Sequence, residues 1–148
     1  MIDIRSFIFE NGEKLITVKA YFYSFYYRFW VKVLPTARLE KKLGERGVES
    51  PEMEVPQKLK IAKLYAFHVN RITKRLPWEA KCFVRALTLR RLLKEKGIAT
   101  TIYMGVYKEN GKLKAHAWLR CGQLYLTGGS GEGMAVVAKF GDLGNDRQ

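Results

Sequence analysis

The spacing of apolar positions divides the chain into a helical first half and a second half made mostly of strands. Apolar residues three or four positions apart predict helices in the first half, and segments rich in Tyr, Ile, Val and Thr predict strands in the second. This order predicts an α+β fold in which N-terminal helices pack on one face of a C-terminal antiparallel β-meander. The expected helices are residues 13–34, 38–47, 58–75 and 80–96, and the expected strands are residues 1–9, 100–108, 113–120, 123–127 and 135–140.

A chain of 148 residues has room for one domain with one core. We expect a helical N-terminal part over residues 1–47 and a linker over residues 48–57, which contain two prolines and three glutamates. Residues 58–148 then form the core that carries the candidate catalytic residues. Because the first part is too small to stand alone, the linker joins two parts of one domain.

The expected helix at residues 13–34 has an aromatic middle, with eight aromatic side chains among residues 21–30. Lys19, Arg28 and Lys32 leave no apolar span near the roughly 20 residues that a bilayer needs, which argues against a transmembrane helix. Two interpretations are left, a core helix with tyrosines at its margins and a docking face for a partner protein or a membrane interface. We favour the core helix.

The chain carries 27 Lys and Arg against 14 Asp and Glu, a net charge of +13, and residues 58–96 alone hold twelve basic and two acidic residues. Such an excess predicts attraction to nucleic acid, a membrane surface or an acidic peptide, and charge alone does not choose among them. Two cysteines are too few for a disulfide framework, and residues 1–10 lack the pattern of a signal peptide. We therefore expect free thiols and a cytoplasmic location.

Cys82 is the candidate nucleophile. It is expected in the first turn of the helix at residues 80–96, where free backbone N–H groups and the helix dipole stabilise a thiolate. Lys81 and Arg85 act in the same direction. The alternative is a buried core cysteine, because Cys82 continues an apolar stripe of that helix. Taken alone, Cys82 fits the alternative better.

His116 is the candidate general base, and it strengthens the catalytic interpretation of Cys82. The other histidine, His68, is expected to be packed or half-exposed on the preceding helix. A cysteine at a helix start with a histidine on a following strand is the arrangement of many acyl-transfer enzymes, and the Cys82 backbone N–H would supply part of the oxyanion hole. No Cys and His spacing typical of a metal site occurs, and Cys121 is interpreted as incidental.

The register of the expected hairpin places further residues around His116. A two-residue Asn-Gly turn sets His116 opposite Gly105 and Trp118 opposite Tyr103. Glycine inside such a strand often marks a close approach, and we expect the start of the helix at residues 80–96 to approach there. Trp118 would then close off the site.

A third group should orient the imidazole of His116. The second expected turn, at residues 121–122, sets Thr127 opposite His116, so the Thr127 hydroxyl is the candidate orienting group. The alternative is a threonine that merely suits a strand, and Glu132 in the following loop is a weaker candidate.

Two stretches of the sequence resemble a known family. The segments LPWEAKCFVRALTLRRLLKEKGI (residues 76–98) and AHAWLRCG (residues 115–122) are similar to the transglutaminase-like leader peptidases of lasso-peptide biosynthesis. The shared features are a Pro-Trp lead-in, a Cys heading an Arg-rich helix that ends in Gly-Ile, and a His-Ala-Trp strand. The separation of 34 residues between Cys82 and His116 also fits, and a weaker likeness covers nearly the whole chain.

The resemblance implies a papain-like or transglutaminase-like fold with a Cys-His-Asp triad. It implies a cysteine protease that cuts the leader from a lasso precursor peptide, so that a cyclase can close the macrolactam. The leader-binding module of the family is either fused or a separate small protein, and the length of this chain implies a separate partner. Residues 123–129 contain no aspartate where the family usually has one, so Thr127, a backbone group or a residue from elsewhere would replace it.

Two other functions are kept open. A non-catalytic basic module would bind nucleic acid or an acidic peptide, but no nucleic-acid recognition motif occurs, and we expect no nucleic-acid partner, cofactor or metal. Another acyl transferase on the same scaffold would differ only in its acceptor, an amine in place of water, and the sequence does not separate the two.

Overall fold

The computed structural model describes residues 12–33, 44–74 and 82–143. The predicted strand at residues 1–9 lies outside these ranges, as does most of the predicted helix at residues 38–47. The prediction of a helix at residues 38–47 is wrong at its C-terminal end, because residues 45–46 form a short strand. The helices are α2 (Gly12–Val33), α4 (Pro56–Thr73) and α5 (Cys82–Lys94), and the strands are β1 (Glu45–Arg46), β2 (Thr100–Glu109), β3 (Lys112–Cys121), β4 (Leu124–Thr127) and β5 (Ala135–Asp142).

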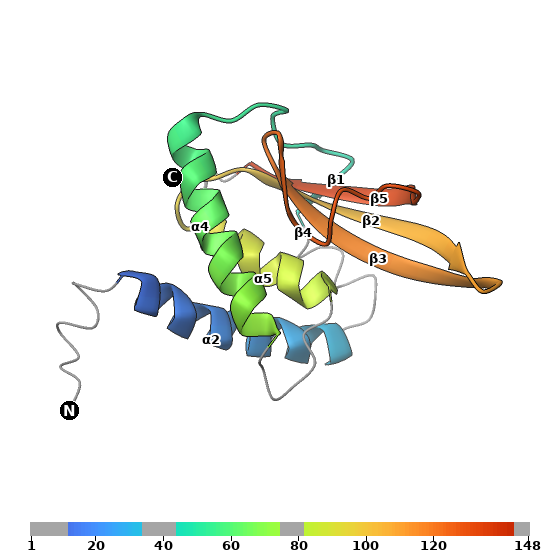
Figure 1. Ribbon diagram of the computed structural model, residues 1–148, viewed down its shortest axis with the longest axis horizontal. Coiled ribbons are helices and arrows are strands. Elements are labelled where there is room, and N and C mark those ends of the chain that lie inside the picture. Colours follow the sequence, from blue (N-terminus) through green and yellow to red (C-terminus); the bar gives the residue numbers. More distant parts are fainter. Residues whose placement is uncertain (1–11, 34–43, 75–81, 144–148) are drawn as a thin grey trace.

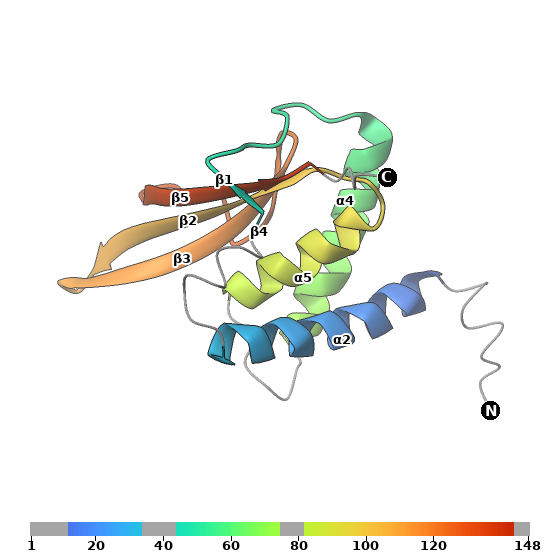
Figure 2. The ribbon, with the colours of Figure 1, turned by 180° about the vertical axis from the view of Figure 1, so that it is seen from behind.

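The helices lie together on one face of the sheet, with α5 between α2 and the strands (Figures 1 and 2). α5 packs against α2, α4 and β3, so it is covered on most of its circumference. This arrangement confirms the predicted α+β class with helices on one side of an antiparallel sheet. The buried residues of α5 are Val84, Ala86, Leu87, Thr88, Leu89, Arg90, Leu92 and Leu93.

The strands form one sheet in the order β1-β5-β2-β3-β4, and each described pair is antiparallel. The predicted meander holds for β2, β3 and β4. β5 does not continue it beside β4 but returns to pair with β2 on the far side. There Phe140 lies opposite Ile102, and both side chains are fully buried, so the return of β5 completes the core.

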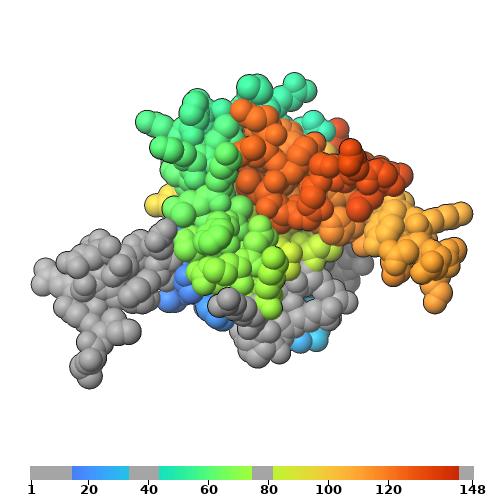
Figure 3. Space-filling model, in the orientation of Figure 1, coloured from blue at the N-terminus to red at the C-terminus, as the bar shows by residue number. Residues whose placement is uncertain are grey.

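The hairpin of β2 and β3 has the predicted register, with Glu109 opposite Lys112. Asn110 and Gly111 have φ angles of 53° and 77°, the positive values that a two-residue type I′ turn requires. The tip of this hairpin is exposed and projects from the body of the molecule (Figure 3).

The two faces of the sheet differ in what they contact. Side chains alternate along a strand, so Ile102 and Leu119 point to the helices, on what we name the inner face. His116, Trp118 and Tyr103 point to the opposite side, the outer face. The hydrophobic core lies between the inner face and α5.

A buried arginine ties α5 to the sheet. Arg90 donates a hydrogen bond to the Thr100 hydroxyl at 3.3 Å and another to the Phe140 carbonyl. Burial lowers the pKa of Arg90 to about 10, because desolvation disfavours the cation. Its two acceptors hold the second half of α5 against β2 and β5.

The aromatic helix α2 turns its phenylalanines to solvent. Phe22, Phe25 and Phe29 are 64%, 56% and 52% exposed, whereas Tyr23 and Tyr27 pack against the core. The prediction of a core helix with tyrosines at its margins is therefore wrong in its orientation. No helix among the described residues is long and apolar enough to span a membrane. The docking interpretation of α2 stays a prediction.

Candidate active site

Cys82 is the first residue of α5 and is half-buried. Residues 75–81, which include Lys81, lie outside the described part of the chain. The first turn of α5 contains no acidic residue. Arg85 follows three residues later, and its Nε is buried without a hydrogen-bond partner among the described residues. Cys82 therefore stands where the described part of α5 begins, and Arg85 follows it within the first turn.

The second thiol, Cys121, lies in a different environment. It is fully buried on the inner face, within the hydrophobic core. Burial raises the pKa of Cys121 to about 11, because a thiolate is poorly solvated there. Cys121 is thus a core residue with little thiolate character, whereas Cys82 is partly open to solvent.

His116 lies within β3, opposite Gly105, as the sequence predicts. Its ring is half-buried, and Nε2 lies 2.7 Å from the carbonyl oxygen of Gly128. A carbonyl oxygen only accepts hydrogen bonds, so Nε2 carries a proton. In the neutral ring Nδ1 then has the free lone pair. The basic atom of His116 is therefore Nδ1. The other histidine, His68, is buried on α4, as expected for a packed residue.

The predicted register between β3 and β4 is wrong. Thr127 lies opposite Leu119 instead of His116. The turn is formed by residues 122–123 and not by the predicted residues 121–122, so Cys121 pairs with Leu124, and an irregularity between Leu119 and Arg120 shifts the register by one more residue. The Thr127 hydroxyl is buried and has no hydrogen-bond partner among the described residues. The group that binds the His116 ring is the next carbonyl along the chain, that of Gly128. Sequence reasoning allowed for a backbone group, but it had no means of telling which one, since every residue has a carbonyl.

The close approach at Gly105 is made by Trp118. A Cβ atom on Gly105 would lie 2.8 Å from two carbons of the indole and 3.2 Å from the carbonyl oxygen of Ala135. The predicted approach of the α5 start at this point is therefore wrong, and the glycine makes room for the Trp118 ring instead.

Three rings form a continuous row on the outer face. Trp118 stacks on Tyr103 with centroids 5.5 Å apart, as the predicted pairing implies, and His116 lies 6.2 Å from Trp118 on its other side. We name His116, Trp118 and Tyr103 the ring row. Trp118 is almost fully buried, because the glycine-rich loop after β4 covers it, as the near contacts of Gly128 and Gly131 show. The ring row therefore gives His116 a dry, rigid neighbour.

A buried arginine that sequence reasoning missed fixes the far end of the ring row. Arg120 Nε donates to the Tyr103 hydroxyl at 3.0 Å, and its other nitrogens donate to the carbonyls of Ser50, Pro51 and Gly122 at 2.9, 3.0 and 2.6 Å. The sequence offered one indication of this role: side chains alternate along β3, which puts Arg120 on the same face as Trp118. This network holds the predicted linker against the sheet.

Cys82 and His116 are carried by elements on different sides of the sheet. α5 packs on the inner face, whereas the His116 ring lies on the outer face. No hydrogen bond joins the two side chains among the interactions of the described residues. The starting end of α5 lies on the side of the molecule where the β2–β3 hairpin projects (Figures 1 and 2). β4 pairs with β3 only from Leu119 to Cys121, and beside His116 the loop after β4 takes over this edge, since a Cβ at Gly128 would lie 2.5 Å from the Ala117 carbonyl oxygen.

Metal-binding groups are not part of this site as far as the structure describes it. Within residues 12–33, 44–74 and 82–143, no three His, Cys, Asp or Glu residues are grouped so as to hold a metal ion. The chemistry available is that of a thiol, an imidazole and backbone groups.

Comparison with known proteins gives one match. A family model described as the transglutaminase-like superfamily matches residues 25–140, which is more than half of the chain. The matched range contains Cys82, His116 and the loop that binds the His116 ring. No curated protein and no solved structure matches the chain.

Proposed function

The chain belongs to the transglutaminase-like superfamily, and we propose that it is a cysteine peptidase that removes the leader from a lasso-peptide precursor. Members of this superfamily are typically cysteine peptidases or acyltransferases. The observation that carries the proposal is the hydrogen bond from His116 Nε2 to Gly128, because it leaves Nδ1 as the atom that accepts a proton from a thiol. The likeness of residues 76–98 and 115–122 to the leader peptidases supports the particular substrate.

The reaction runs in two halves. His116 Nδ1 takes the proton of the Cys82 thiol, and Sγ attacks the carbonyl carbon of the scissile amide. The C–N bond breaks as the imidazolium returns the proton to the leaving nitrogen. This step frees the core peptide with a new amino terminus and leaves the leader as a thioester on Cys82. Water, deprotonated by Nδ1, then attacks the thioester and releases the leader as a carboxylic acid, and the thiol regains its proton.

Backbone groups carry the supporting roles. The Gly128 carbonyl accepts from Nε2–H throughout, and this bond strengthens when the ring becomes a cation. It takes the place of the aspartate that is missing from residues 123–129. The backbone N–H of Cys82, at the start of α5, donates to the oxyanion of the tetrahedral intermediate. Trp118 keeps water from one side of the imidazole.

The proposal includes two protein partners. A separate leader-binding protein would present the precursor, and the exposed phenylalanines of α2 offer an apolar surface for it to bind. A macrolactam-forming cyclase would act next, because it needs the free amino terminus that leader removal creates. A membrane surface is the alternative occupant of α2.

The test is leader cleavage in a reconstituted mixture. The precursor peptide, the leader-binding protein and this protein are incubated together, and the products are followed by liquid chromatography and mass spectrometry. Cys82→Ala and His116→Ala should each abolish cleavage. Cys121→Ala is the matched control, since it removes the buried thiol and should leave cleavage in place. Cleavage that persists in both of the first two variants would refute the proposal.

The acceptor of the acyl group separates hydrolysis from acyl transfer. In water enriched with ¹⁸O, a peptidase places one heavy oxygen in the new carboxylate of the leader. An acyltransferase supplied with an amine instead gives an amide of the leader without label. An amide product in preference to the labelled acid would reassign the enzyme to acyl transfer on the same residues.

A further inference from the structure

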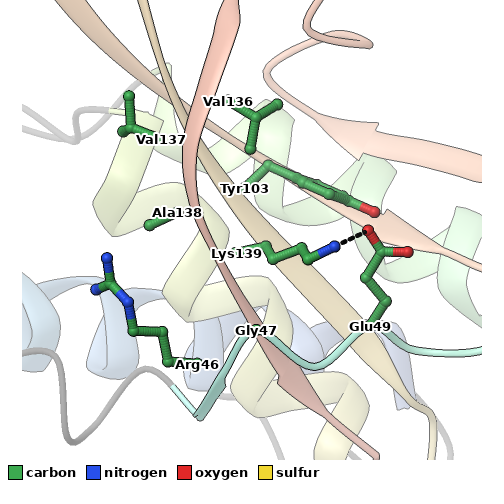
Figure 4. Close-up of a pocket in the computed structure, with 8 residues that line it drawn as sticks. All are labelled: Arg46, Gly47, Glu49, Tyr103, Val136, Val137, Ala138 and Lys139. Atoms are coloured by element: carbon green, nitrogen blue, oxygen red, sulfur yellow. Dashed lines mark hydrogen bonds and ion pairs between the residues drawn. The ribbon is translucent and has the colours of Figure 1, made fainter.

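Two surfaces on either side of His116 could receive an extended peptide, and the loop after β4 excludes one of them. A hollow of about 520 Å³ lies beside β5, and Figure 4 shows Lys139 directed to Glu49 there, an ion pair of 3.0 Å. The glycine-rich loop lies over the buried Trp118, between His116 and this hollow. The hollow therefore does not continue the candidate active site. The direction that is left leads from His116 toward the tip of the β2–β3 hairpin.

β3 has an open edge on the hairpin side of His116. β4 and the loop after it cover this edge from Ala117 onward, since a Cβ at Gly128 would lie 2.5 Å from the Ala117 carbonyl oxygen. Residues 112–115 are all exposed, and no strand of the described chain pairs with them on this side. The open stretch of the edge therefore ends beside His116.

The turn of the hairpin determines which backbone groups face this edge. In a hairpin with a two-residue turn, the closing pair, here Glu109 and Lys112, exchanges both backbone hydrogen bonds, and every second pair after it does the same. The residues between, Leu113 and Ala115, turn their N–H and C=O groups away from β2. Ala117 continues this alternation, and its carbonyl is the one that meets the loop. The open edge therefore presents the backbone donors and acceptors to which an extended peptide adds as a further strand.

The side chains at this edge favour a peptide that alternates apolar and acidic residues. Leu113 is 68% exposed and points to the inner-face side, whereas Lys112 and Lys114 point to the outer-face side. Lys114 already pairs with Glu109 at 3.1 Å, but Lys112 and Lys108 make no ion pair with any described residue. A second copy of this chain would bring its own lysines and a net charge of +13, so charge opposes pairing of the edge with itself.

The open edge lies within reach of the candidate catalytic histidine. A strand added to β3 runs about 4.8 Å from it, so its backbone would pass beside His116 where the open stretch ends. The rise from Lys112 to His116 is about 13 Å, which roughly four residues of an extended peptide cover. Antiparallel pairing is the more stable arrangement, and it directs the peptide from His116 toward the hairpin tip. The residues that follow the scissile bond would then occupy the edge.

We propose that the first residues after the scissile bond of the peptide substrate bind as an added antiparallel strand on residues 113–115 of β3, with apolar side chains beside Leu113 and acidic side chains toward Lys112. The identity of this segment as substrate rests on the proposed function. The strand hydrogen bonds hold the peptide backbone beside His116, so this edge selects which amide bond is presented for cleavage.

The test is binding of synthetic peptides to the full-length Cys82→Ala protein, so that cleavage does not consume the probe. The probe is a fluorescein-labelled hexapeptide of alternating Val and Glu, followed by fluorescence polarisation and by ¹⁵N chemical shifts of the protein. Methylation of the Val amide nitrogens removes the hydrogen bonds to β3, whereas methylation of the Glu amide nitrogens, which point away from β3, is the matched control. We expect the amides of Leu113 and Ala115 to shift, and Val methylation alone to weaken binding about tenfold.

Substitutions at Leu113 separate the contribution of the backbone from that of the side chain. Leu113→Pro removes an N–H that β2 does not use, whereas Leu113→Ala keeps this donor and shortens the side chain. We expect Leu113→Pro to weaken peptide binding about tenfold and Leu113→Ala less than about threefold, while the ¹⁵N spectra show that the hairpin still forms in both. In cleavage assays, Leu113→Pro should raise KM for the precursor with little change in kcat.

Two charge reversals test the preference for acidic side chains. Lys112→Glu changes the hairpin tip, whereas Lys60→Glu makes the same change in net charge on the exposed face of α4. We expect Lys112→Glu to weaken binding about fivefold and Lys60→Glu to change it less than about twofold. Equal weakening by the two variants would overturn the acidic preference.

Each remaining outcome decides against one statement. Equal binding of the two methylated peptides, or equal affinity of Leu113→Pro and Leu113→Ala, would overturn the added strand. A dimer that Leu113→Pro dissociates would assign the edge to a second copy, and tighter binding of a short DNA duplex at the same amides would assign it to nucleic acid; either would overturn the proposal. Shifts at Leu113 and Ala115 without Cys82-dependent cleavage would overturn the proposed function and leave a peptide-binding edge standing. Cleavage with the same KM in Leu113→Pro as in the unaltered protein would overturn the edge alone.

Discussion

The carbonyl of Gly128 should be the group that makes His116 an effective base, and two adjacent glycines allow a direct test. Gly128 and Gly129 both have positive φ, 76° and 81°. A Cβ at Gly128 would lie 2.5 Å from the Ala117 carbonyl oxygen and 3.1 Å from His116 Nε2, whereas nothing lies within 4 Å of a Cβ at Gly129. Gly128→Ala therefore adds a clash to the conformational cost, and Gly129→Ala measures that cost alone.

The expected magnitudes follow from these contacts. An alanine at positive φ costs about 1–2 kcal/mol of stability, and both variants carry this cost. At Gly128 the new methyl meets strand backbone, so the loop must move away and the 2.7 Å hydrogen bond to His116 is lost. A hydrogen bond to a charged ring contributes about 1.5–3 kcal/mol. Its loss should lower kcat for leader cleavage about 10- to 150-fold in Gly128→Ala.

The assay is single-turnover cleavage of the precursor, with urea unfolding of each variant alongside. Gly129→Ala should retain kcat within about twofold of the unaltered protein, while its free energy of unfolding falls by the conformational cost of about 1–2 kcal/mol. The reasoning is wrong if Gly128→Ala cleaves as fast as Gly129→Ala. It is also wrong if both lose activity equally, because the loop as a whole would then matter and not the carbonyl.

Three more predictions concern reactivity, docking and acid stability. Iodoacetamide at pH 8 should alkylate Cys82 before Cys121. With a pKa of about 11, Cys121 is only about 0.1% thiolate at this pH, even where the reagent gains access to it. Peptide mass spectrometry measures the labelling, and equal labelling of both cysteines in the folded protein would contradict the prediction. Phe22→Ser should leave the unfolding free energy within about 0.5 kcal/mol but weaken binding of the leader-binding protein in calorimetry; unchanged affinity would exclude α2 as the docking face. Burial alone would raise the pKa of Glu95, yet its bonds to Tyr23 and other partners lower it below 4.5. The ionised Glu95 therefore contributes roughly 0.5–1 kcal/mol to the free energy of unfolding, in full above pH 4.5, and this contribution is lost as pH falls through the lowered pKa. Glu95→Gln should be less stable than the unaltered protein at neutral pH and equally stable at pH 2. A difference in unfolding free energy that persists at pH 2 would contradict this.

Features set by neighbouring residues along the chain could be predicted from the sequence. The Asn110-Gly111 turn determines the pairing of β2 with β3, so His116 opposite Gly105 and the stacking of Trp118 on Tyr103 follow by counting. The helices were likewise found from apolar spacing, although α5 is buried on most of its circumference and not along one stripe.

Features that depend on tertiary packing could not be predicted. Thr127 is displaced from His116 because the second turn lies one residue later than predicted, at residues 122–123, and because the pairing is irregular near Leu119; no residue type specifies that irregularity. α2 turns Tyr23 toward the body of the molecule, where it is partly buried and its hydroxyl binds Glu95, a partner 72 residues away; hydropathy alone would bury the phenylalanines instead. The acceptor for the His116 ring is a backbone carbonyl, which no residue type identifies.

The structure carries the two candidate catalytic side chains on opposite sides of the sheet. α5, which begins at Cys82 in the described chain, packs on the inner face, and His116 lies on the outer face with Nε2 bound to the loop after β4. That loop also lies against β3, because a Cβ at Gly128 would be 2.5 Å from the Ala117 carbonyl oxygen. The loop therefore fixes Nε2, and Nδ1 is the nitrogen that the proposed reaction uses. Since no described interaction joins the thiol to the imidazole, the separate variants Cys82→Ala and His116→Ala are the decisive measurements: the proposal requires each alone to abolish leader cleavage.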